Sequence, residues 1–112
     1  IRVAYSDDSG NDFKLAKIFK NGNQIQGRVD LSANAEGTWM LWLEEDDNQI
    51  LWLARLDKQL NTVGSPIRVA QLQGRGRATG FARMQALGKS VYVVWTDTVN
   101  GKPKIQGAQF RF

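Results

Sequence analysis

Two segments of this chain, residues 27–44 and 80–97, resemble each other closely enough to constrain the whole fold. They read GRVDLSANAEGTWMLWLE and GFARMQALGKSVYVVWTD, and they align without a gap at an offset of 53 residues. In this alignment Trp42 falls on Trp95. A segment that recurs in this way predicts a fold built from repeated supersecondary units, each packing on the next.

The second half of each segment alternates apolar side chains with the two-residue period of a β-strand. In the first strand, Trp39, Leu41 and Leu43 lie on one face, and Met40 and Trp42 lie on the other. In the second strand, Val91, Val93 and Trp95 lie on one face, and Tyr92 and Val94 lie on the other. Apolar residues on both faces are typical of strands that are covered on both sides. Turn sequences such as NGN, LGKS and TVNGKP recur about every ten residues, which favours short antiparallel strands over helices.

The sequence predicts nine short strands in three groups. They cover residues 1–5 and 13–18, then 27–33, 39–43, 50–56 and 67–70, and finally 81–87, 91–95 and 104–110. A repeat of roughly 40 to 50 residues with four strands is the unit of a β-propeller blade. We therefore predict an all-β chain of consecutive four-stranded antiparallel blades, forming a single partial propeller domain. In that domain, residues 1–18 end one blade, 27–70 form a full blade and 80–112 begin the next.

The stretch SDDSGNDF, from Ser6 to Phe13, carries clustered acids and admits three interpretations: a metal loop, a catalytic acid or a turn. A calcium loop of the EF type continues from its glycine to a glutamate about six residues further on, and this stretch lacks that glutamate. In a turn, the Asp8 carboxylate accepts hydrogen bonds from backbone amides, Gly10 adopts a positive φ, and Phe13 packs back as a plug. The sequence favours the turn, without a bound metal.

The order Ser6-x-Asp8-x-Gly10-x-x-Phe13 resembles the Asp box of the sialidase and BNR-repeat families. The segments GRVDL, WMLWLEE, GFARM and VVWTD are similar to segments of sialidase-like propellers of the exo-α-sialidase type, so the resemblance covers nearly the whole chain. It implies a six-bladed propeller, an acidic glycan as ligand and a structural role for the Asp box. It also implies secretion or export to the periplasm.

The resemblance further implies a catalytic set gathered from the whole ring: a tyrosine nucleophile paired with a glutamate, an aspartic acid and three arginines. The chain departs from the family at Ala82, where a proline is expected, and after Asp57, where little of a second Asp box remains. Its two tyrosines, Tyr5 and Tyr92, lie inside predicted strands, where aromatic residues usually belong to the core. We expect no complete active site in this chain, and hydrolase activity of the whole propeller stays open.

Candidate ligand-binding residues follow from their position in a propeller. The starts of first strands and the ends of second strands approach one rim of the central channel. The charged residues predicted to come together there are Arg28, Asp30, Arg83, Glu44 and Asp97. Structural ion pairing between blades is an equally good explanation for such a cluster.

Two functions follow. In the first hypothesis the chain is part of a sialidase-like propeller that binds or processes acidic glycans. In the alternative it is part of a non-catalytic scaffold or lectin-like propeller that makes protein or sugar contacts. Four tryptophans help to separate the two hypotheses: exposed rings would indicate sugar stacking, and buried rings would indicate packing between blades. The alternation predicts that most of them are buried.

The amino-acid composition limits the kinds of catalytic and metal sites that this chain can form. The chain has neither cysteine nor histidine, which excludes disulfides and thiol catalysis and argues against a Ser-His-Asp triad or a zinc site. We expect no metal and no cofactor. No apolar run approaches the roughly 20 residues of a membrane helix, so no membrane contact is predicted.

The formal net charge is +4, and basic residues gather in RGRATGFAR, which contains Arg75, Arg77 and Arg83. A single short basic cluster without a nucleic-acid-binding fold argues against DNA or RNA as a partner. A small anionic ligand fits better, because guanidinium groups bind carboxylates in a bidentate manner. Exposed strand edges predict a further partner, either the remainder of a longer chain or another copy in a homo-oligomer.

Overall fold

The computed structural model describes residues 2–6, 8–18, 25–45, 48–73 and 82–112. This part of the chain contains nine β-strands and no helix. The strands are β1 (Arg2–Tyr5), β2 (Lys14–Ile18), β3 (Ile25–Asn34), β4 (Gly37–Glu45), β5 (Gln49–Leu56), β6 (Ile67–Leu72), β7 (Arg83–Leu87), β8 (Ser90–Val99) and β9 (Lys102–Arg111).

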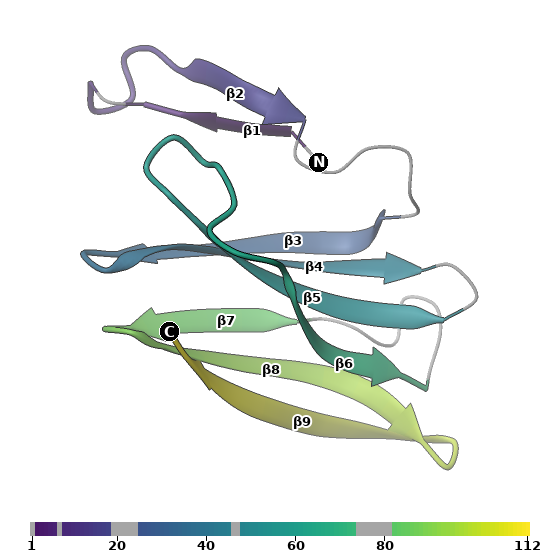
Figure 1. Cartoon of the computed structure of the whole chain (residues 1–112). Helices are drawn as coiled ribbons and strands as arrows, with labels where there is room; N and C mark the ends of the chain where they lie inside the picture. The colour runs from purple at the N-terminus through teal and green to yellow at the C-terminus, as the bar shows by residue number, and fades with distance from the viewer. Residues whose placement is uncertain (1, 7, 19–24, 46–47, 74–81) are drawn as a thin grey trace.

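The strands form three antiparallel sheets, which we name A, B and C. Sheet A pairs β1 with β2, sheet B has the order β3-β4-β5-β6, and sheet C has the order β7-β8-β9. Figure 1 shows the sheets as successive layers, with sheet B between the other two. The predicted all-β antiparallel architecture is confirmed, and each predicted strand overlaps an observed one.

Several strands are longer than predicted, above all β8 and β9. The prediction ended one strand at Trp95 and began the next at Lys104, whereas pairing continues to Val99 and Lys102. The turn between them is Asn100-Gly101, with φ of 52° and 75°. Two consecutive positive φ values suit a tight turn that matches the twist of a hairpin, so the strands stay paired up to it. Residues 1 and 81, which the prediction placed in strands, lie outside the described residues.

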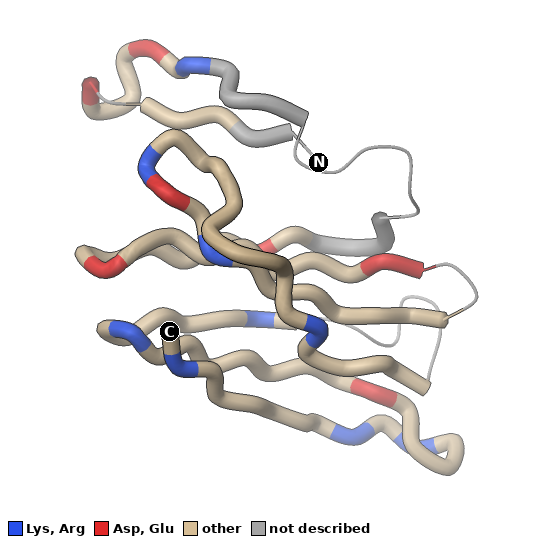
Figure 2. The backbone as a smooth tube through the Cα atoms, viewed as in Figure 1, with Lys and Arg blue, Asp and Glu red and all other residues tan. Residues whose placement is uncertain are grey.

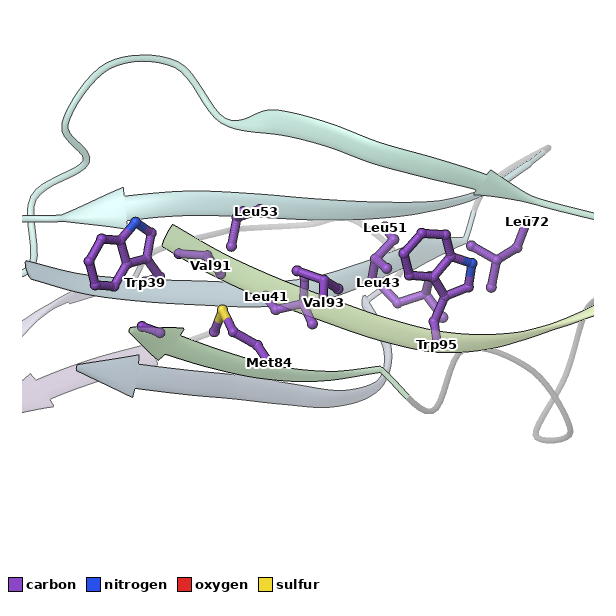
Figure 3. Packing of buried hydrophobic residues seen from close by; sticks show 11 residues of the cluster. Trp39, Leu41, Leu43, Leu51, Leu53, Leu72, Met84, Val91, Val93 and Trp95 are labelled. Atoms are coloured by element: carbon purple, nitrogen blue, oxygen red, sulfur yellow. The ribbon is translucent and has the colours of Figure 1, made fainter. Parts of the chain in front are cut away.

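The main core lies between sheets B and C. From β4, Trp39, Leu41 and Leu43 point into it, and they meet Val91, Val93 and Trp95 from β8 (Figure 3). The alternate residues of β4, Met40 and Trp42, belong to a second cluster on the opposite face of sheet B. Burial on both faces of β4 confirms the alternation predicted for this strand.

The same alternation in β8 is accompanied by burial on only one face of the strand. Val91 and Val93 are buried, but Tyr92 and Val94 on the other face are 43% and 49% exposed. The prediction that this strand is covered on both sides, and that Tyr92 is a core residue, is therefore wrong for the described chain. The reason is that sheet C is the last layer of the stack, and none of the described sheets packs on its outer face (Figure 1).

The turn between β1 and β2 contains the predicted Asp box. The Asp8 carboxylate accepts hydrogen bonds from the Asp12 amide at 2.9 Å and from the Ser6 hydroxyl at 2.7 Å. The Ser6 oxygen in turn accepts from the Gly10 amide at 2.8 Å, and Gly10 has a φ of 87°. These contacts are the ones expected of a turn held by its own side chains.

Phe13 does not act as a plug in this structure, because its side chain is 67% exposed. Sheet A has only two strands, so it offers little apolar surface against which the ring could pack. The turn after β5 is held in a similar way to the Asp box, although little of the motif remains there. One Asp57 carboxylate oxygen accepts hydrogen bonds from the Gln59 and Asn61 amides, both at 2.9 Å.

Candidate functional site

The five predicted ligand-binding residues fall on four strands. Asp30 lies on β3, Glu44 on β4, Arg83 on β7 and Asp97 on β8; Arg28 also lies on β3, but its side chain is outside the described part. Asp30 and Arg83 line one shallow pocket of about 400 Å³. The remaining lining residues are Met84, Gln85, Tyr92 and Val94. Glu44 and Asp97 lie elsewhere and have other contacts.

Asp30 binds the neighbouring sheet through its carboxylate. One oxygen accepts a hydrogen bond from the Met84 amide of β7 at 2.9 Å, and the other accepts from the Leu31 amide at 3.1 Å. β7 lies at an edge of sheet C, and on that edge its amides have no strand partner. An unpaired amide at a packed interface is costly, so the carboxylate satisfies a donor that the sheet leaves open.

Two further side chains of β3 continue this arrangement, and together with Asp30 we call the three contacts the β3–β7 ladder. The contacts are Asp30 with the Met84 amide, Ser32 with the Ala86 amide at 3.1 Å, and Asn34 with the Gly88 carbonyl at 3.0 Å. Alternate residues of a strand point to one face, which explains the regular spacing. The sequence prediction missed Ser32 and Asn34, although the pattern D-x-S-x-N directly before a turn was a readable signal.

Asp97 is 3% exposed and also bonds to backbone amides. Its two carboxylate oxygens accept from the Gln73 amide at 3.0 and 3.1 Å, and one of them accepts from the Thr98 amide at 2.8 Å. Gln73 directly follows β6, so Asp97 joins sheet C to the outer strand of sheet B. Asp30 and Asp97 thus join the same two sheets through backbone amides. The ion pairing between blades that the sequence also suggested stays a prediction.

Glu44 accepts a hydrogen bond from the Trp42 indole nitrogen at 3.2 Å. The exposed fractions of Trp39, Trp42 and Trp95 are 0%, 2% and 6%, and Trp52 is half-buried. The indole nitrogens of Trp39, Trp52 and Trp95 are buried and have no hydrogen-bond partner among the described residues. The burial of these rings fits packing between sheets rather than sugar stacking.

Arg83 differs from the acids because its side chain is exposed and has no hydrogen bond or ion pair to the described residues. In the pocket it is accompanied by Tyr92, whose hydroxyl lies 3.4 Å from the donating Gln109 amide nitrogen. Within the described chain, no glutamate is bonded to that hydroxyl. The pocket therefore offers the Arg83 guanidinium, the Tyr92 ring and the Gln85 amide to an anion, next to an Asp30 carboxylate whose two oxygens already accept hydrogen bonds from backbone amides. Among the described residues it lacks the tyrosine–glutamate pair that sialidase chemistry requires.

No three acidic side chains of the described residues come close enough together to hold a metal ion. None of the described segments forms a helix that could cross a membrane. No protein-family model, curated protein or solved structure matches the chain. The family resemblance therefore rests on the sequence motifs and stays a prediction.

Proposed function

We propose that this chain is part of a sialidase-like β-propeller that binds acidic glycans and has no complete active site of its own. The observation that supports this proposal best is that the charged residues differ in what they contact. Asp30 and Asp97 bond to amides of the adjoining sheet, whereas the Arg83 guanidinium stands exposed in a pocket beside Tyr92. A carboxylate on a sugar can pair with the guanidinium in a bidentate manner while the sugar ring contacts the aromatic face.

The shape of the pocket fits binding better than hydrolysis. Hydrolysis requires a nucleophile and an acid held together away from bulk water. Here the Tyr92 hydroxyl meets an amide and is part of a 43% exposed side chain. Such a surface suits a terminal acidic sugar that projects from a larger glycan.

The scaffold alternative is supported by a separate observation, the burial of Trp39, Trp42 and Trp95. In that interpretation the chain would hold sheets together and present protein-binding loops, with Arg83 simply solvated. Both hypotheses predict a protein without turnover, and only the first predicts that an acidic sugar binds at Arg83.

The test is a titration of the chain with sialyllactose and, as a neutral control, lactose, followed by NMR chemical shifts. We expect sialyllactose to shift resonances of Arg83 and Tyr92, and lactose to leave them in place. Hydrogen bonds to charged groups contribute about 1.5–3 kcal/mol, so Arg83→Gln should weaken binding roughly tenfold or more. Arg68→Gln removes an exposed arginine from β6 and should leave binding unchanged.

Equal binding of both sugars, or full affinity in Arg83→Gln, would contradict the glycan proposal and leave the scaffold interpretation. A fluorogenic sialoside should not be hydrolysed by the chain. Turnover that is lost in Tyr92→Phe would show that the pocket is catalytic after all.

A further inference from the structure

Arg111 is a second exposed arginine on the face of sheet C that carries the Arg83 pocket. Its side chain has no hydrogen bond or ion pair to the described residues. The next residue, Phe112, donates its amide to the Lys89 carbonyl at 2.9 Å, and its ring packs against Trp39 with 5.7 Å between the ring centroids. The backbone that carries Arg111 is therefore anchored, and its guanidinium remains open to a ligand.

The strand register places Tyr92 midway between the two arginines. Tyr92 lies opposite Gln85 of β7 and Gln109 of β9. Arg83 comes two residues before Gln85, and Arg111 comes two residues after Gln109. Each arginine is therefore a diagonal neighbour of Tyr92, one on either side. Diagonal neighbours on one face of a sheet are about 7–8 Å apart, which puts roughly 15 Å between the backbones of the two arginines.

The groups between the two arginines are of the kind that bind sugar hydroxyls. The Gln109 side-chain amide donates to the Tyr92 hydroxyl at 3.4 Å and to the Ser90 hydroxyl at 3.5 Å. The Gln85 side chain is exposed on the other flank of Tyr92. Hydroxyls and amides both donate and accept hydrogen bonds, as sugar hydroxyls do. The face thus offers a cation at each end of a path and neutral polar groups along it.

The charge of sheet C favours an anionic ligand. Residues 83–112 contain five lysines and arginines and one aspartate, and basic residues predominate along this sheet in Figure 2. The one aspartate, Asp97, is buried and bonds to the Gln73 amide on the other face. Asp30, which lines the pocket, is already bonded to two backbone amides. Both arginines can therefore pair with carboxylates that a ligand supplies.

In a chain that binds acidic glycans at Arg83, as proposed above, we propose that Arg111 binds a second acidic sugar of the same glycan. Side chains stand nearly perpendicular to a sheet, and Tyr92 lies between the two arginines, so one carboxylate does not serve both. The ligand class is an oligosaccharide in which acidic sugars are repeated. Its chain crosses Tyr92 and Gln109, and two of its carboxylates pair with the two guanidinium groups.

The experiment compares two sugars by titration followed by NMR chemical shifts. Trisialic acid repeats the acidic sugar, whereas sialyllactose carries it once. The variants are Arg83→Gln and Arg111→Gln. Lys102→Gln is the matched control, because it also removes one positive charge from sheet C and Lys102 is exposed on the opposite face. Circular dichroism checks that each variant keeps its β-structure.

We expect trisialic acid to bind the wild type about tenfold or more tightly than sialyllactose, because the second contact forms within an already bound ligand. It should also shift resonances of Gln109 and Arg111. Arg111→Gln should remove this preference and keep the affinity for sialyllactose within about twofold, whereas Arg83→Gln should weaken the binding of both sugars. Lys102→Gln should keep both affinities within about twofold.

Equal affinity of the wild type for the two sugars, or an unchanged preference in Arg111→Gln, would overturn the second acidic site and leave glycan binding at Arg83 intact. If Arg111→Gln weakened sialyllactose as strongly as Arg83→Gln does, both arginines would serve one carboxylate, which also overturns the second site. Binding of neither sugar would contradict the proposed function itself, and this site with it. An oligonucleotide of the same charge that binds as tightly as trisialic acid would assign the face to phosphates instead of sugars.

Discussion

Asp8 is the residue whose local chemistry is most completely defined. The Asp12 amide and, secondarily, the Ser6 hydroxyl donate hydrogen bonds to its carboxylate, and both lower its pKa. These contacts favour the charged form, because an ionised carboxylate accepts hydrogen bonds more strongly than a neutral one. The turn between β1 and β2 thus depends on the charge of one side chain.

The direction of this pKa shift predicts how pH acts on the turn. A carboxyl group whose pKa is lower in the folded state stabilises that state above its unfolded pKa, about 3.9 for aspartate. The stabilisation is lost as pH falls through the lower, folded pKa. Thermal melting between pH 7 and pH 2 should therefore show a smaller acid-induced decrease for Asp8→Asn than for the wild type.

Calcium provides the control for this prediction, because a metal loop is the alternative interpretation of the same stretch of sequence. A chelator should leave the melting temperature unchanged at neutral pH. A decrease of several degrees would show that the stretch is a metal loop, and identical acid profiles for both proteins would show that the Asp8 charge is irrelevant.

At the scale of elements, the two repeats place a tryptophan at the same point of their second strand. Trp42 on β4 and Trp95 on β8 each lie on the face that points towards the preceding layer, A for the first and B for the second. Their exposed fractions are 2% and 6%. The offset of 53 residues found in the sequence therefore corresponds to equivalent strand positions.

Replacement of either ring by alanine should have a similar effect, because each ring is almost fully buried and its removal leaves a large cavity. We expect Trp42→Ala and Trp95→Ala each to lower the free energy of unfolding by about 3 to 5 kcal/mol. Urea denaturation measures the loss, and Trp42→Phe and Trp95→Phe, which retain most of the apolar surface, should lose less. Unchanged midpoints in both alanine variants would refute the equivalence of the two strands.

The elements could be predicted from the sequence because alternation is a strong signal in a strand such as β4, where every second residue enters the same cluster. The ends of strands could not, since Val99 and Lys102 pair only because the Asn100-Gly101 turn is tight. The exposure of Tyr92 was not predictable either. Its own sequence pattern is that of a buried residue, and only the absence of a described covering sheet exposes it.

At the scale of the whole molecule, the candidate site was predictable in part. Asp30 and Arg83, two of the five predicted residues, line one pocket, and their role in ligand binding stays a prediction. Position in the repeat could not reveal that Asp30 and Asp97 bond to amides of the adjoining sheet, because alternation says which face a side chain occupies and not which backbone group it meets. Those contacts depend on how two sheets stack, which is a property of the assembled layers.

The β3–β7 ladder couples sheet B to sheet C along their edge strands β3 and β7, and it can be tested one contact at a time. Asp30→Ala should expose the Met84 amide to exchange with solvent, and Ser32→Ala should do the same for the Ala86 amide. Loss of one such hydrogen bond costs about 1 to 3 kcal/mol, so the affected amide should exchange roughly tenfold faster. Hydrogen exchange followed by NMR measures both amides in one sample.

The two variants are controls for each other, since each removes one acceptor and leaves the other in place. If the ladder acts as separate contacts, each substitution accelerates its own amide far more than the neighbouring one. Equal acceleration of Met84 and Ala86 in both variants would mean that sheet C separates from sheet B as a unit. In that case the shared core of Leu41 and Val93, and not the ladder, would hold the layers in register.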